Sequence, residues 1–239
     1  MSELPPPLPP AERTVGQLVA EAIRAYGDNF WRVLPLGIPL ALLDELALGR
    51  SGLDWLVRFL ACAPLLALAF AYACTIVGGV APTPRRLALA TLAGTIVLLP
   101  TAAFLPWFAL LAVAYLALAG LAVPVVVLEG KGPLAALRRA VELGRADYVH
   151  ALGSLATLVL LFFLSKVVLV LLLQGQADNT LRAAIFLADV VLAPIMLLGA
   201  AILHGDQAAR LEQRRARRGP EGRAPAGDGT RRPKARARR

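Results

Sequence analysis

The chain has 239 residues, of which 58% are hydrophobic and only 17% charged. Residues 87–128 and 148–173 are too long and too poor in charge for a soluble core, because about 20 apolar residues suffice to cross a bilayer as a helix. The composition therefore excludes a soluble globular enzyme and predicts a membrane protein with several spans. We expect room for five or six spans and none for an appended catalytic domain.

The formal net charge of +9 is concentrated at one end, since residues 206–239 hold twelve Lys or Arg and four Asp or Glu. We predict three parts: a disordered Pro-rich start (1–13), a six-span membrane domain (14–211) and a basic disordered tail (212–239). A helical extension of the last span could reach Arg218. The tail can contact anionic lipid, RNA or a protein partner, but it lacks aromatic residues for sequence-specific reading of nucleic acid.

An amphipathic helix is predicted ahead of the first span. Thr14 and Gln17 have the spacing of a capping box, in which hydroxyl and amide satisfy free amide groups at a helix start. Apolar residues then recur at helical spacing over residues 15–26, with charged residues on the other side. This helix either lies in the membrane interface or packs on the membrane body as a cytoplasmic helix.

The apolar pattern predicts an all-α, polytopic transmembrane helical bundle of about six spans, with two interfacial amphipathic helices. The expected spans cover residues 30–48, 55–80, two within 87–128, 148–173 and 181–203. Within 87–128, Pro100 and Pro106 favour a tight reversal between two spans. The alternative is one kinked helix with a re-entrant piece.

The distribution of basic residues predicts the orientation of the bundle. With six spans both termini share one side, and its loops carry Arg85, Arg86 and the basic residues of the connector between the fourth and fifth spans. The opposite loops carry only Arg50, Arg58 and Arg182. Because short basic loops stay inside, both termini are predicted to be cytoplasmic.

That connector, residues 123–148, is the second amphipathic segment. Pro133 suits a first helical position, where its missing N–H is not needed. We expect the helix to lie on the cytoplasmic leaflet, where basic side chains reach anionic headgroups. The candidate lipid headgroup contacts are Lys131, Arg138, Arg139 and Arg145.

Two charged residues lie well inside predicted spans, where a charge usually has a partner or a function. Lys166 and Asp189 are each eight residues from the outer end of their helices, so both lie about 12 Å deep. We predict an intramembrane ion pair, either structural or part of a transport or ligand site; Lys166 alone could also snorkel outward. Four neighbouring charges either extend this pair or simply cap helices: Asp44, Glu45, Asp54 and Arg58.

No catalytic residue, metal site or cofactor is predicted. Cys62 and Cys74 lie in one apolar run without neighbouring metal ligands, so both are expected to be buried free thiols. His150 and His204 are expected to be neutral interfacial side chains. The alternative is a His–Asp site with Asp147 or Asp206.

Three segments read TVGQLVAEAIRAYGDNFWRVLPL from Thr14, PVVVLEGKGPLAALRRAVEL from Pro124 and LLGAAILHGDQAARL from Leu197. They resemble a bacterial family of multi-span proteins grouped with the membrane domain of glycerophosphoryl diester phosphodiesterase. The chain departs from the family pattern at Ala140 and at residues 204–206. The resemblance implies a membrane module of the bacterial plasma (inner) membrane without the catalytic domain.

The sequence thus favours a non-catalytic integral inner-membrane protein with a structural or accessory role and lipid contacts at its cytoplasmic face. One alternative is a small permease or lipid-handling protein that uses Lys166 and Asp189. Another is a membrane factor that recruits a cytoplasmic protein partner through its basic tail.

Overall fold

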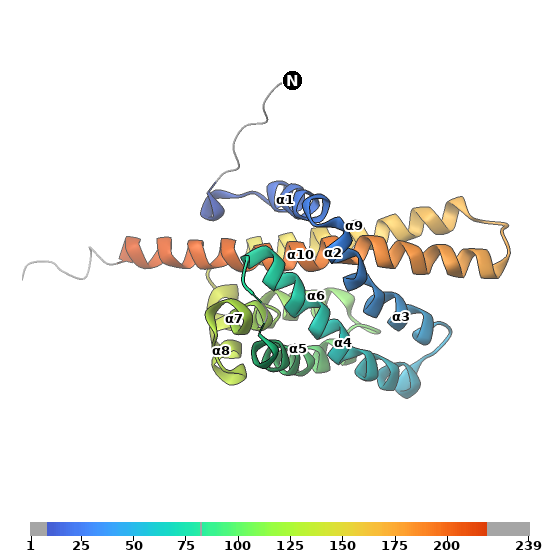
Figure 1. The fold of residues 1–239 in the computed structure, drawn as a ribbon, viewed down its shortest axis with the longest axis horizontal. Coiled ribbons are helices and arrows are strands. Elements are labelled where there is room, and N and C mark those ends of the chain that lie inside the picture. Colours follow the sequence, from blue (N-terminus) through green and yellow to red (C-terminus); the bar gives the residue numbers. More distant parts are fainter. Residues whose placement is uncertain (1–8, 82, 219–239) are drawn as a thin grey trace, which may run out of the picture.

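The computed structural model describes residues 9–81 and 83–218, and throughout these residues the regular structure is helical. The chain forms an all-α bundle in which α9 and α10 make a long hairpin along one side (Figure 1). Five helical segments are long and apolar enough to cross a membrane: α4 (Gly52–Gly78), α5 (Pro84–Phe104), the α6–α7 unit (Ala109–Glu129), α9 (Tyr148–Leu172) and α10 (Asp178–Arg218). The chain is a multi-pass membrane protein.

The first predicted span, residues 30–48, is not a continuous helix. It consists of α2 (Phe30–Val33), the 3₁₀ turn η2 (Leu34–Gly37) and α3 (Ile38–Ala47), and a proline stands in the first turn of both η2 and α3. A proline has no N–H for the preceding turn, so the helix breaks. Each piece is shorter than a bilayer requires, so this segment is not among the five that are long and apolar enough to cross a membrane as one helix.

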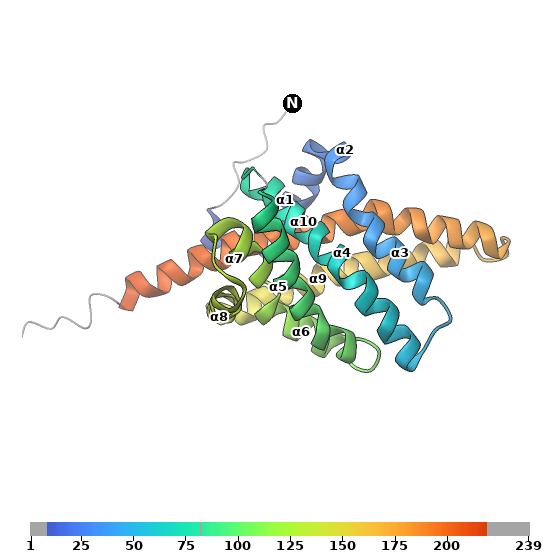
Figure 2. The same ribbon diagram turned by 60° about the horizontal axis from the view of Figure 1, so that its bottom comes forward.

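The broken segment nevertheless lies beside α10. A Cβ on Gly37 would lie 2.6 Å from the Cα of Val190, and Glu45 forms an ion pair with Arg182, so its contacts move along α10 by eight residues, or about 12 Å of helix. Ahead of it, Ala22 on α1 faces Gly199, where an added Cβ would lie 3.4 Å away. From Ala22 to Glu45 the contacts therefore move along about 26 Å of α10. Figure 2 shows α3 lying alongside α4.

The long apolar run at residues 87–128 folds as predicted into two membrane-crossing segments. α5 ends at Phe104 and α6 (Ala109–Ala119) begins after a turn that contains Pro106. α6 packs against α5, which excludes the single kinked helix. The second segment has a break of its own at Gly120, after which α7 (Ala122–Glu129) continues.

Both amphipathic segments are helical. α1 (Val15–Asp28) begins with the predicted capping box, in which Thr14 accepts from the amide of Gln17 and the Gln17 side chain accepts from the amide of Thr14. It packs on α9 and α10 and is seen nearly end-on in Figure 1, where α10 lies horizontally. α8 (Pro133–Gly144) covers the ends of α6 and α7.

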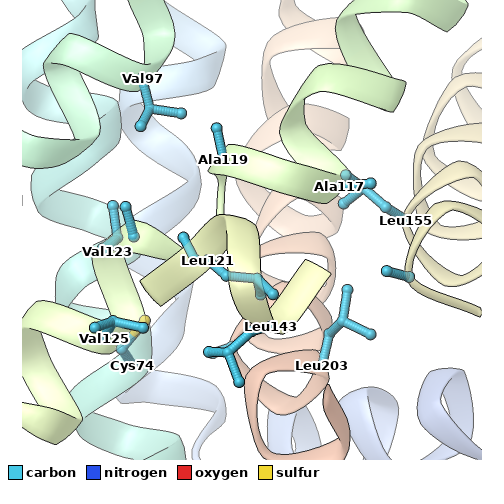
Figure 3. Close-up of a cluster of buried hydrophobic side chains, with 14 of the residues drawn as sticks. Cys74, Val97, Ala117, Ala119, Leu121, Val123, Val125, Leu143, Leu155 and Leu203 are labelled. Atoms are coloured by element: carbon cyan, nitrogen blue, oxygen red, sulfur yellow. The ribbon is translucent and has the colours of Figure 1, made fainter. Parts of the chain in front are cut away.

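Small residues fill the interior. α7 is almost entirely buried, and its valines pack against α4 and α5 next to Cys74 (Figure 3). A Cβ on Gly94 would lie 2.7 Å from that of Ala67, so α4 and α5 approach closely. Cys62 and Cys74 are buried free thiols, as predicted.

Large apolar side chains cover the outside of α9. Exposed examples are Leu160, Phe163, Leu164, Leu171 and Leu172. In the most apolar 18-residue stretch of this helix, only 11% of the residues are buried inside the protein. Such a surface suits lipid contact, because hydrocarbon chains are as apolar as the side chains themselves.

Candidate functional site

A charged cluster joins three helices at one end of the bundle. The ammonium group of Lys166 on α9 lies 2.9 Å from Oδ1 of Asp189 on α10 and donates a hydrogen bond to Oδ2 of the same residue at 3.2 Å. It also donates to Asp44 on α3. The structure therefore brings the two predicted intramembrane charges together and adds a third. We call Lys166, Asp189 and Asp44 the charged triad.

Burial differs strongly within the charged triad. The side chain of Asp189 is fully buried, that of Lys166 is 17% exposed and that of Asp44 is 41% exposed. The Lys166 ammonium also lies 5.3 Å from the ring centroid of Phe162. Because two carboxylates share one ammonium group, the triad has one more acid than base, and Asp44 is the member that reaches outward.

The neighbouring charges divide between the two predicted roles. Glu45 pairs with Arg182, so α3 makes an ionic contact with α10 as well as with α9. Asp54 stays local, with Arg58 at 3.1 Å and Arg50 at 3.5 Å. The triad thus extends to α3, whereas the charges at the start of α4 pair among themselves near the helix end.

A second polar cluster occupies the opposite end of α10. The fully buried Asp206 accepts a hydrogen bond from Arg13 at 3.2 Å. Gln207, also fully buried, accepts from the amide of Asp147 at 3.2 Å and donates to its carbonyl at 3.3 Å. Arg210 is 2.6 Å from the Asp147 carboxylate and donates to the carbonyl of Arg13. These contacts hold the segment before α1 and the start of α9 against α10.

Glu129, at the end of α7, is the centre of a neighbouring group of contacts. Its carboxylate lies 2.6 Å from Lys131, 3.4 Å from Arg139 and 3.2 Å from Nε2 of His204. Arg139 also contacts Glu142 at 2.9 Å. The connector is therefore fixed to the bundle by ionic contacts as well as by apolar ones.

The four predicted headgroup contacts fall into two groups. Lys131 and Arg139 form ion pairs with acidic residues of the protein. Arg138 and Arg145 have exposed side chains and line a groove with Arg214 and Arg215, which belong to α10. The predicted domain boundaries assign Arg214 and Arg215 to the tail. The signal that could have placed them on α10 is their helical spacing after Leu211. α10 does reach Arg218, and a 3₁₀ turn, η1 (Pro10–Glu12), precedes α1, so residues 10–12 and 212–218 are helical where disorder was predicted. The rest of the predicted disorder, at 1–8 and 219–239, lies outside the described residues.

The two histidines make different contacts from those of the predicted His–Asp site. Nε2 of His150 is 3.9 Å from Oδ2 of Asp206, beyond hydrogen-bond distance, and His204 faces Glu129 rather than an aspartate. Within residues 9–81 and 83–218, no group of three or more His, Cys, Asp or Glu side chains could hold a metal ion.

Comparison with protein-family models, curated proteins and solved structures finds no match for this chain. Its function must therefore be inferred from the charged triad, the polar cluster and the groove themselves.

Proposed function

We propose that the chain is a non-catalytic, multi-pass module of the bacterial inner membrane with a structural or accessory role. The observation that carries this proposal is the charged triad. Lys166 of α9 is bound by carboxylates from α3 and α10, so an intramembrane charge serves to join three helices. The resemblance of the amphipathic start, the connector and the α10 exit to a family of membrane modules supports the same role.

The distribution of charge supports cytoplasmic termini. Arg13, Arg86 and the basic connector all lie at the Asp206 end of the bundle: Arg13 pairs with Asp206, and a Cβ on Gly130 would lie 3.7 Å from the Arg86 guanidinium. At the triad end, the arginines pair with nearby acids: Arg50 and Arg58 with Asp54, and Arg182 with Glu45. The excess of basic residues at the first end favours its retention in the cytoplasm.

A double-mutant cycle on Lys166→Met and Asp189→Asn, read as thermal unfolding in a mild detergent, tests the structural role. Each single change leaves a buried charge with fewer partners, so each destabilises, and the double variant recovers part of the loss. We expect a coupling free energy of about 1–3 kcal/mol. The exposed pair Glu21→Gln and Arg24→Gln is the control, for which we expect less than about 1 kcal/mol.

One observation favours a second function, a small permease or lipid-handling protein. The charged triad has a surplus carboxylate, and Asp44 is 41% exposed. A site of this kind could exchange its ammonium partner for a cationic solute. If the cycle shows no coupling and Lys166→Met leaves the unfolding temperature unchanged, the structural proposal fails. Uptake of cationic solutes into proteoliposomes then becomes the test of the second function.

A further inference from the structure

A basic groove lies between α8 and α10 at the Asp206 end of the bundle. Its volume is about 430 Å³. The lining combines four arginines with one acid and a small apolar surface: Arg138, Arg145, Arg214, Arg215, Glu142, Val141, Ala146 and Leu211. We call it the α8–α10 groove.

Helical spacing explains why these side chains converge. Arg138 and Val141 lie on α8, and Arg145 is its C-cap residue with helical backbone angles; their spacings of three, four and seven residues place them on one face. Leu211 and Arg215 share a face of α10 for the same reason. Leu211 is buried at the base, whereas the arginines are exposed at the rim. The groove thus has an apolar floor beneath a strongly basic opening.

The protein neutralises only part of the positive charge of the groove. Arg215 pairs with Glu142, and Arg214 donates to the carbonyl of Arg145 at 3.2 Å. In the described part of the chain, the guanidinium groups of Arg138 and Arg145 have no acidic partner. Four arginines against one carboxylate leave a net charge of three, which favours an anion.

We propose that the α8–α10 groove binds the phosphate group of an anionic phospholipid. Guanidinium groups bind phosphate oxygens through paired N–H donors, which suits a site with several converging arginines. The apolar floor of Val141 and Leu211 provides a surface for the glycerol and the first acyl carbons. A free phosphate ion would use the same arginines but would gain nothing from that floor.

The position of the groove also favours a lipid. α8 is amphipathic: Ala136, Ala140 and Leu143 are buried, while Leu134 is 67% exposed. An exposed leucine beside basic residues is typical of a helix at the level of lipid headgroups. The inference rests on the proposed inner-membrane orientation, because anionic lipid attracts basic residues at the cytoplasmic leaflet.

Glu142 restrains the groove. The hydrogen bond from Arg139 holds the pKa of Glu142 below its ordinary value, so the side chain is charged at neutral pH. It then occupies Arg215 and contributes the only negative charge to the lining. Replacing Glu142 with glutamine should therefore strengthen lipid binding, whereas loss of the arginines should weaken it.

The test uses the full-length protein in detergent and compares retention of phosphatidylglycerol and phosphatidylcholine by native mass spectrometry. We expect Arg138→Gln/Arg145→Gln to weaken phosphatidylglycerol retention about 30-fold and Glu142→Gln to strengthen it about fivefold. The matched control is Arg32→Gln/Arg85→Gln, which removes two exposed arginines outside the groove and should change little. Unfolding temperatures of all variants establish that they are folded.

Each outcome decides one question. Equal losses in the two double variants would show general attraction between charges and overturn the groove as a site. Displacement of phosphatidylglycerol by millimolar inorganic phosphate, with no preference for the lipid, would assign the groove to free phosphate and overturn the lipid. The structural role at Lys166 lies at the other end of the bundle, so its failure would leave these results unchanged.

Discussion

Arg13 donates a hydrogen bond to Asp206, 193 residues later in the chain, at 3.2 Å. The Asp206 side chain is fully buried, and its Oδ2 atom has no hydrogen-bond partner in the described part of the protein. The carbonyl of Arg13 in turn accepts from Arg210. The segment before α1 is thus attached to α10 through both the side chain and the backbone carbonyl of Arg13.

This relationship predicts an asymmetry between two substitutions. Arg13→Gln removes the hydrogen-bonded cationic partner of a buried carboxylate and should destabilise the protein by about 2–3 kcal/mol. Asp206→Asn removes the charge itself and leaves a partly exposed arginine that water can solvate, so it should cost less. Thermal unfolding in detergent measures both. Arg24→Gln, on the exposed face of α1, serves as a control and should stay within about 0.5 kcal/mol; equal costs for the first two changes would contradict the prediction.

The charged triad predicts a second ordering of costs. Asp189→Asn changes a fully buried carboxylate and should destabilise by about 2–3 kcal/mol, whereas Asp44→Asn changes a half-exposed one and should cost less than about 1 kcal/mol. Unfolding temperatures of the two variants, measured in the same detergent, decide the order. A larger effect at Asp44 would mean that Lys166 depends chiefly on α3.

The position of Lys166 opposite Asp189 was accessible from the sequence because helical rise is constant. Two charges equally far from one short turn on antiparallel helices must lie at equal depth. The participation of Asp44 was one of two alternatives that the sequence left open, because its depth does not follow from helical rise in the same way. Its helix is separated from the preceding one by a 3₁₀ turn, and such a break changes the direction in which every later side chain points. Pro35 and Pro39 were the signal that residues 30–48 would not be one helix.

The α8–α10 groove was only half predictable. Arg138 and Arg145 stand out from the amphipathic pattern of one segment, and the sequence assigns them to headgroups. Arg214 and Arg215 look like part of a basic tail until α10 is seen to continue as a helix past Leu211. Their meeting with α8 depends on tertiary packing, which periodicity within a single segment does not contain.

Alanine substitutions at two glycines, Gly37 and Gly205, are predicted to change the stability of the protein in opposite directions. A Cβ on Gly37 would lie 2.6 Å from the Cα of Val190, so Gly37→Ala forces η2 away from α10 and should destabilise by about 1–3 kcal/mol. Gly205, within α10, has nothing within 4 Å of its Cβ position. Gly205→Ala should therefore stabilise by about 0.5–1 kcal/mol through helix propensity. Unfolding temperatures of both variants test the close approach; stabilisation by both would contradict it.

The last prediction concerns the number of crossings. If residues 30–48 cross the membrane despite their break, Gly16→Cys, Thr83→Cys and Gly132→Cys lie on the cytoplasmic side, and Ser51→Cys and Gln176→Cys lie outside. A membrane-impermeant maleimide should then label the last two in intact cells and the first three only after permeabilisation.

The native cysteines provide the background for this experiment. Cys62 and Cys74 are 5% and 0% exposed, so the unmodified protein should label poorly in either condition. Position 16 carries the most information, because it precedes the broken segment while the other four follow it. Labelling of Gly16→Cys in intact cells, together with protection at Thr83→Cys, would mean five crossings and place the start of the chain outside. The contacts of Ala22, Gly37 and Glu45 along about 26 Å of α10 favour the opposite result.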